Sequence, residues 1–251
     1  MSVTELTVEV CVDSLDSALA AERGGARVEL CASLMEGGVT PSAGLIATAR
    51  QRVSIALHVM IRPRAGDFYY SADEFDVMRR DVLMAKQLGA EGVVFGILDP
   101  DANIDVQKTR ALVDLARPLS VTFHRAFDMS ADLFRSLEQV RETGADRILT
   151  SGGAQTAVEG AATLRRLVKQ AGESVIIMAC GGINDENVRA VVEKTAVREI
   201  HVALRTPAAS PMRYRNENIS MGTVDENEYQ RYIVLEDRVA RLIRVASGRD
   251  A

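Results

Sequence analysis

The stretch VTFHRAFD, residues 121–128, changes abruptly from strand-forming to titratable side chains. Its first three residues favour a buried strand, and His124, Arg125 and Asp128 follow within the same stretch. Such an ending belongs either to a solvated turn or to a strand that delivers side chains to a site. The nearby arginine and carboxylate favour the second alternative, a functional site in which His124 can transfer protons near neutral pH.

Several other apolar runs also carry residues that can do acid–base chemistry. Because side chains alternate along a strand, Glu9 shares a face with Cys11, and Glu29 shares a face with Cys31. If these faces point into one interior, the charges must pair, since each unpaired buried charge costs on the order of several kcal/mol. The candidate acid–base residues are Glu9, Glu29, Arg62, His124, Asp128 and His201. A structural role is an equal alternative for His201, and His58 is interpreted as a core histidine.

Glycine-rich turns and arginines suggest a place for an anion. The strings SGGA at residues 151–154 and CGGIND at 180–185 could turn backbone N–H groups toward a phosphate at a helix N-terminus, or simply form tight turns with a helix cap. Arg62 and Arg64 could bind a carboxylate or phosphate, or form salt bridges with Glu29 or Asp67. The candidate anion-binding residues are Arg64, Arg125, Ser151, Gly152, Gly153, Gly181, Gly182 and Asn184.

The cysteines allow a metal site as well as a simpler role. Cys11 and Cys31 lie at equivalent ends of neighbouring strands, where two thiolates could hold a soft ion such as Cu(I). The alternative is that they are small buried core residues, as free cysteines commonly are. The odd total of three cysteines and the absence of a CxxC motif argue against a disulfide framework and a structural zinc site.

Eight short runs rich in Val, Ile and Leu alternate with amphipathic segments along the chain. The predicted strands are residues 7–12, 27–31, 56–61, 92–98, 120–126, 147–151, 175–179 and 199–203. The predicted helices include residues 15–23, 72–88, 132–143, 161–171 and 185–194. Gly25, Gly89 and Gly144 each stand where a helix closes and the next strand begins, so the unit repeats.

This repetition predicts an α/β fold, a closed (β/α)8 TIM-type barrel forming a single domain over residues 1–251. Closure leaves no parallel strand unpaired, whereas the alternative, an open doubly wound sheet, would more naturally carry a GxGxxG motif after its first strand. The sequence pattern of residues 206–223 matches neither a helix nor a strand, so an extended loop is predicted after the eighth strand. A last helix is predicted over residues 227–246.

Composition excludes several classes of protein. A net charge of −5 does not indicate the basic surface of a nucleic-acid-binding protein, and no apolar run approaches the length of a membrane span. The amino terminus lacks a secretion signal, which predicts a cytoplasmic protein. All four lysines, Lys86, Lys108, Lys169 and Lys194, fall on predicted helices, so no strand-borne amine can form a Schiff base. No organic cofactor is predicted.

Seven strings agree in order with a known family. They are EVCVDS, RVELCA, EGGVTPS, VMIRPRAGDFYYS, VTFHRAFD, ILTSGG and SPMRYRN, and together they resemble the CutC copper homeostasis family over nearly the whole chain. The resemblance implies a cytosolic TIM-type barrel, a homodimer or higher homo-oligomer, and Cu(I) binding. Its candidate copper thiols fall on Cys11 and Cys31. Its polar barrel mouth falls on Glu9, Glu29, Arg62, His124, Arg125, Asp128 and His201.

Two functions therefore remain open. The first is a cytosolic copper homeostasis protein of CutC type that binds Cu(I). The second is a TIM-barrel enzyme that acts by acid–base chemistry on a small anionic metabolite, a phosphorylated one included. A carrier needs only two or three soft ligands, and the predicted mouth holds more than that task requires. A scaffold that recruits a partner through residues 206–223 is a third hypothesis.

Overall fold

The computed structural model describes residues 6–216, 218–219 and 228–248. Eight parallel strands close into a barrel, with β1 hydrogen-bonded to β8 as well as to β2. The strands are β1 (Thr7–Val12), β2 (Arg27–Leu30), β3 (Leu57–Met60), β4 (Gly92–Phe95), β5 (Ser120–Phe123), β6 (Arg147–Thr150), β7 (Ile176–Ala179) and β8 (Glu199–Val202). This closure confirms the predicted (β/α)8 fold and excludes the open sheet.

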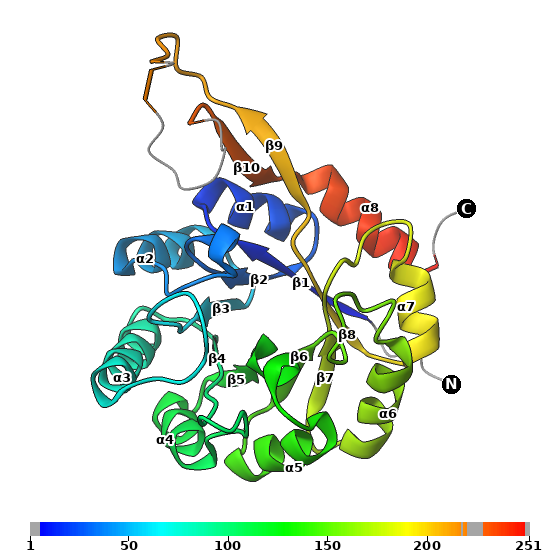
Figure 1. The fold of residues 1–251 in the computed structure, drawn as a ribbon. Helices are drawn as coiled ribbons and strands as arrows, with labels where there is room; N and C mark the ends of the chain where they lie inside the picture. The colour runs from blue at the N-terminus through cyan, green and yellow to red at the C-terminus, as the bar shows by residue number, and fades with distance from the viewer. Residues whose placement is uncertain (1–5, 217, 220–227, 249–251) are drawn as a thin grey trace.

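Helices surround the barrel on its outer side (Figure 1). They are α1 (Leu15–Arg23), α2 (Ala43–Arg52), α3 (Ala72–Gln87), α4 (Val106–Ala116), α5 (Leu133–Thr143), α6 (Ala161–Ala171), α7 (Val188–Thr195) and α8 (Glu236–Ala246). Local sequence sets several of their ends. Ser71 and Glu74 form a capping box at the start of α3, and Gly144 closes α5 with a φ of 81° that favours glycine. None of the helices in the described part of the chain combines the length and apolar character that crossing a membrane requires.

Alternation along β1 and β2 separates an apolar layer from a polar interior. In β1, Val8, Val10 and Val12 belong to the large apolar cluster that packs the strands against the helices. The side chains of Glu9 and Cys11 point the other way, into the barrel, because successive side chains alternate along a strand. The odd-numbered positions of β2 follow the same rule, so the barrel interior receives carboxylates, thiols and arginines instead of only aliphatic groups.

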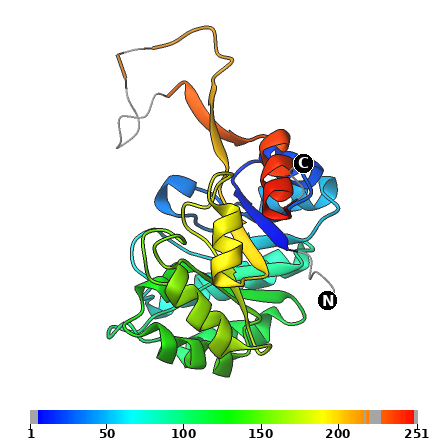
Figure 2. The ribbon, with the colours of Figure 1, turned by 90° about the vertical axis from the view of Figure 1, so that its right-hand side faces the viewer.

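The segment after β8 differs from the prediction. Residues 205–209 form β9 (Arg205–Ala209), which pairs antiparallel with β10 (Gln230–Val234), and this ribbon extends away from the barrel (Figure 2). The extended loop predicted over 206–223 therefore begins with a strand, and its residues 217 and 220–223 lie outside the described residues. The helix predicted from residue 227 begins only at Glu236, because Tyr232, Ile233 and Val234 favour a strand and find a partner in β9.

Candidate functional site

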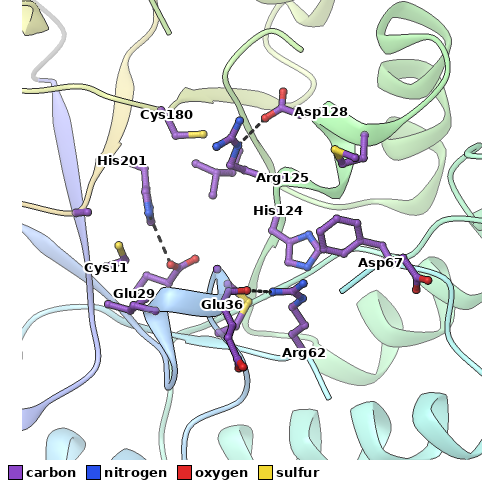
Figure 3. Close-up of a pocket in the computed structure, with 18 of the residues that line it drawn as sticks. Cys11, Glu29, Glu36, Arg62, Asp67, His124, Arg125, Asp128, Cys180 and His201 are labelled. Atoms are coloured by element: carbon purple, nitrogen blue, oxygen red, sulfur yellow. Dashed lines mark hydrogen bonds and ion pairs between the residues drawn. The ribbon is translucent and has the colours of Figure 1, made fainter. Parts of the chain in front are cut away.

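A cavity of about 1150 Å³ opens at the carboxyl ends of the barrel strands. Loops after β2, β3, β4, β5 and β7 and the segment after β8 contribute to its walls. The predicted site residues that line it are Cys11, Glu29, Arg62, His124, Arg125, Asp128, Gly181, Gly182 and His201. Figure 3 shows six of them in two groups, with Cys11, Glu29 and His201 on one wall and Arg62, His124 and Arg125 on the opposite wall.

The first wall brings together three groups that can bind a metal ion. Cys11, Glu29 and His201 each offer one ligand atom, and these atoms lie within 4.8 Å of one another. Strand register produces this proximity, because Cys11 is the partner of Glu29 across β1 and β2, and His201 in β8 is the partner of Glu9 in β1. This wall is called the thiol wall below.

Glu9 lies one layer beneath the thiol wall, fully buried, and holds His201 in place. The Glu9 carboxylate is 2.9 Å from Nδ1 of His201, 2.7 Å from Nε of Arg27 and 3.2 Å from Nδ1 of His58. Burial alone would raise the pKa of Glu9, but hydrogen bonds from His201 and His58 and the charge of Arg27 outweigh it and hold the pKa well below its usual range. Glu9 therefore orients His201 without facing the cavity.

The environment of His201 favours its charged form. Burial acts to lower the pKa of His201, but the Glu29 and Cys11 side chains raise it well above its ordinary value. With Nδ1 bound to Glu9, the other ring nitrogen, Nε2, lies 3.7 Å from Glu29. An imidazole fixed by a carboxylate at Nδ1 presents Nε2 in the orientation that metal-binding histidines commonly show.

The two cysteines predicted as a metal pair occupy different surroundings. Cys11 lines the cavity, whereas Cys31 packs against Met60 and Val94 and its thiol lies 3.4 Å from Glu29 Oε2, to which it donates. Burial and the charge of Glu29 raise the pKa of Cys31 well above its ordinary value. Burial also raises the pKa of Glu29, whose second oxygen, Oε1, has no hydrogen-bond partner in the described structure.

On the opposite wall, Arg62 binds backbone carbonyls. Its Nη1 donates to the carbonyls of Glu36 at 2.9 Å and Gly38 at 3.1 Å, and its Nη2 donates to Gly66 at 2.8 Å. Within the described ranges no carboxylate lies within ion-pair distance of this guanidinium, so the alternative pairing with Glu29 is not formed. The positive charge of Arg62, which is 5% exposed, is therefore not neutralised by a neighbouring side chain.

His124 is a neutral histidine with one free ring nitrogen. Burial and the charge of Arg62 lower its pKa to about 3. Its Nδ1 accepts a hydrogen bond from the backbone N–H of Ala126 at 3.2 Å, so the single proton of the neutral ring is on Nε2. That Nε2 is buried and has no partner among the described residues. Gly96 makes room for the ring, because a Cβ there would come within 2.5 Å of Nδ1.

The SGGA turn holds a carboxylate of the chain itself. Asp128 accepts from the backbone N–H groups of Ser151 at 3.1 Å and Gly153 at 3.0 Å. The N–H of Gly152 donates to Thr150 Oγ1, and Arg125 Nε pairs with Asp128 at 2.8 Å. Ser151, Gly152 and Gly153 were predicted to bind an anion, and in the structure the N–H groups of Ser151 and Gly153 bind the Asp128 carboxylate.

Two other predicted residues do not line the cavity, whereas Phe68, which was not predicted, does. Arg64 faces outward and pairs with Glu74 and Asp67, as the salt-bridge alternative proposed. Asn184 lies in the turn before α7, where its backbone N–H donates to Asn187 and its carbonyl accepts from Val188. No role was predicted for Phe68, although its ring lies 5.0 Å from both the His124 ring and the Arg62 guanidinium and lines the cavity. Its only signal was its place in an aromatic-rich loop.

The closed (β/α)8 barrel and the polar cavity at the carboxyl ends of its strands place this chain among TIM-type barrel proteins, whose active sites lie at that end. The CutC family model matches residues 6–206, so the chain belongs to the CutC family. The CutC family protein of Bacteroides thetaiotaomicron is 47% identical over 94% of this chain and 96% of its own length. The copper homeostasis protein cutC homolog of Homo sapiens is 44% identical over 96% of this chain and 89% of its own length.

Solved structures agree with this assignment. A putative copper homeostasis protein CutC from Streptococcus agalactiae matches with a TM-score of 0.74 and 33% identity, covering 78% of this chain and 98% of that one. Phosphoribosylanthranilate isomerase from Pyrococcus furiosus matches with a TM-score of 0.58 at 13% identity, covering 97% of this chain and 99% of that one. The second likeness shows a shared barrel fold.

Proposed function

We propose that this chain binds Cu(I) at the thiol wall and acts in copper homeostasis in the cytoplasm. The observation that carries the proposal is the cluster of Cys11, Glu29 and His201, whose ligand atoms lie within 4.8 Å of one another. A thiolate and an imidazole are ligands that suit Cu(I). The names of the human and Streptococcus agalactiae relatives, which refer to copper homeostasis, support the same reading.

The surroundings of the cluster fit this role. Cys11 and His201 supply the soft and borderline donors, and Glu29 supplies a carboxylate whose Oε1 has no partner in the described structure. Glu9 holds Nδ1 of His201 and directs Nε2 toward the other two groups. Ion binding requires the thiol and Nε2 to release their protons. In this proposal Cys31 donates a hydrogen bond to Glu29 and helps to position this carboxylate in the cluster.

Titration of reduced protein with Cu(I) against a competing chelator tests the proposal. Cys11→Ser is expected to weaken binding by more than the roughly 10- to 100-fold that loss of an outer-shell partner costs. Cys31→Ser is expected to have a smaller effect. Cys180→Ser is the matched control, because Cys180 is also buried and also lines the cavity but lies outside the cluster. Equal affinity of wild-type protein and Cys11→Ser would remove this site from consideration.

The cavity volume favours an enzyme as the second candidate. Small-molecule pockets usually measure about 300–1,000 Å³, and a single copper ion would leave most of the 1150 Å³ cavity unfilled. Glu29, with its raised pKa and its free oxygen, is the proposed acid–base group. Profiling of metabolites and metals by thermal shift on the purified protein tests this candidate, and stabilisation by metals alone would count against it.

The compartment and assembly are part of the same proposal. All three cysteines are free and buried, which suits a reducing cytoplasm. A homodimer or higher homo-oligomer is supported by apolar side chains exposed on and beside the β9–β10 ribbon, namely Met212, Tyr214 and Tyr232. Light scattering on the purified chain measures the assembly, and a monomer at all concentrations would contradict it.

A further inference from the structure

The wall opposite the thiol wall presents a hydrogen-bond donor that no group of the described residues accepts. His124 is 4% exposed, lines the cavity and carries its proton on Nε2, because Nδ1 already accepts from Ala126. A buried donor without a partner carries a free-energy cost, because it has given up its hydrogen bond to water. In a cavity-lining residue, this cost is relieved when a ligand supplies an acceptor. The partner that His124 lacks is therefore an acceptor atom.

Positive charge surrounds this donor. Arg62 has no carboxylate partner in the described ranges, and its guanidinium and the His124 ring contact the same Phe68 ring, each at 5.0 Å. Arg125 binds Asp128 through Nε and Ser151 through Nη2, and its Nη1 makes no hydrogen bond with any described residue. Figure 3 shows His124 between these two arginines. An acceptor that carries negative charge fits this wall best.

Carboxylates at the cavity rim already have partners. Asp67 pairs with Arg64, and Asp99 accepts from the backbone N–H groups of Asp101 and Asn103 within its own turn. Asp128 is held by Arg125 and the SGGA turn, and Glu36 accepts from the Ser33 hydroxyl. These groups leave the charge of Arg62 and the donor of His124 available to a ligand.

We propose that His124, Arg62 and Arg125, called the basic wall, bind the oxyanion group of a small organic molecule. The group is a carboxylate or a phosphate, and the apolar body of the molecule lies against Phe68, Leu98 and Leu149, which also line the cavity. Binding here requires neither copper nor a reaction, so the site stands or falls separately from the thiol wall. If the cavity is an active site, this wall anchors the substrate.

Isothermal titration of metal-free protein at constant ionic strength tests the proposal. The probes are inorganic phosphate, benzoate and benzamide, the last being an uncharged analogue of benzoate. Saturable binding of phosphate or benzoate, with benzamide at least about tenfold weaker than benzoate, is expected if the wall selects an oxyanion. Whichever of the two anions binds identifies the oxyanion class. Saturable binding of benzamide as tight as that of benzoate, or no saturable binding of either anion, would overturn the proposal.

Two histidine variants isolate the donor. His124→Asn keeps an acceptor near the Nδ1 position but removes the donor, and it is expected to weaken anion binding about tenfold or more. His124→Gln can place an amide N–H where Nε2 lies, so it is expected to recover part of the affinity. A purely structural role of His124 would not distinguish the two variants. Unchanged affinity in a folded His124→Asn protein would contradict the proposal.

A pair of arginine variants provides a test that does not disturb a buried side chain. Arg125 has a side chain that is 45% exposed, so Arg125→Gln is expected to fold and to weaken anion binding about tenfold. Arg64→Gln removes the same charge from a residue that faces away from the cavity, and it is expected to leave affinity unchanged. An equal loss in both variants would show only a general effect of net charge and would overturn the site.

Discussion

The barrel interior contains two layers of charge that differ in how completely they are paired. At the floor, Glu199 binds Arg27 at 2.6 Å and Arg147 at 2.6 Å. At the mouth, Oε1 of Glu29 and Nε2 of His124 are buried without a partner in the described structure. Both layers lie inside the same barrel. The chain itself completes the hydrogen bonds of Glu199 at the floor, and we propose that a ligand completes those at the mouth.

This difference separates stability from function along the barrel axis. Charged groups at the amino-terminal end of barrel strands commonly serve stability, while those at the carboxyl end serve binding and catalysis. Glu9 lies between the layers, because it binds Arg27 below and His201 above. Substitutions at the floor should thus change mainly stability, substitutions at the mouth should change mainly binding, and substitutions at Glu9 should change both.

Glu199→Gln should have the largest effect on stability. The change leaves the buried Arg147 without its carboxylate and Arg27 with Glu9 as its remaining partner, and breaking a buried pair in this way costs about 3–5 kcal/mol. Burial acts to raise the pKa of Glu199, but Arg147 and Arg27 lower it overall, so this stabilisation is present above the ordinary carboxyl pKa and is lost as the pH falls. Urea unfolding measures the free energy of unfolding, with the exposed Glu173→Gln as a control. A loss below about 1 kcal/mol would break the comparison.

Glu9→Gln should affect both layers. Arg27 keeps Glu199 as a partner, so the expected loss is about 2–3 kcal/mol, the scale of hydrogen bonds to charged groups. Because His201 loses the carboxylate that fixes Nδ1, Cu(I) affinity should fall by about 10- to 100-fold. Unfolding and chelator competition on the same preparation measure the two effects. A stability loss with unchanged Cu(I) affinity would place Glu9 entirely in the floor.

The fold was predictable because its signal is local and repeated. Gly25, Gly89 and Gly144 have φ angles of 92°, 87° and 81°, as expected of residues that close helices. The eight predicted strands are all present, although several end earlier than predicted, and His124 caps a short 3₁₀ helix (Arg125–Met129) instead of continuing β5. The error at residues 230–234 arose because their strand partner, β9, lies in another part of the sequence.

The depth of each side chain in the barrel was less predictable. Glu9 and Cys11 share a strand face, and two residues correspond to about 6.6 Å along a strand, enough to separate a supporting group from a cavity-lining group. Strand stagger decides which residue reaches the mouth, and no local pattern encodes it. The group that the SGGA turn binds was also difficult to predict, because Ser151 donates to Asp128, which lies 23 residues away in the sequence.

His124→Asn should change the response of stability to pH. The folded-state pKa of about 3 lies below the ordinary value of 6.5, so the unfolded chain takes up the proton first and His124 opposes folding as the pH falls. Between pH 6.5 and pH 5 this effect removes roughly 1.5 kcal/mol of stability from the wild-type protein. The variant should lack this part of the decline. Urea unfolding at both pH values measures the difference, and equal declines in the two proteins would contradict a neutral His124 in the folded state.

Glu29→Gln should have the smallest effect on stability. It is the sharpest comparison with Glu199→Gln, because both substitutions replace one carboxylate oxygen inside the same barrel. Glu29 has no arginine partner in the described structure, and its nearest cationic nitrogen, Nε2 of His201, lies at 3.7 Å and retains Glu9 as a neighbour through Nδ1. The free energy of unfolding should therefore change by less than about 1 kcal/mol. Cu(I) affinity should nevertheless fall at least about tenfold, because the cluster loses an anionic ligand. A loss of stability as large as that of Glu199→Gln would show that the mouth is held together by the same pairing as the floor, and the separation of the two layers would then fail.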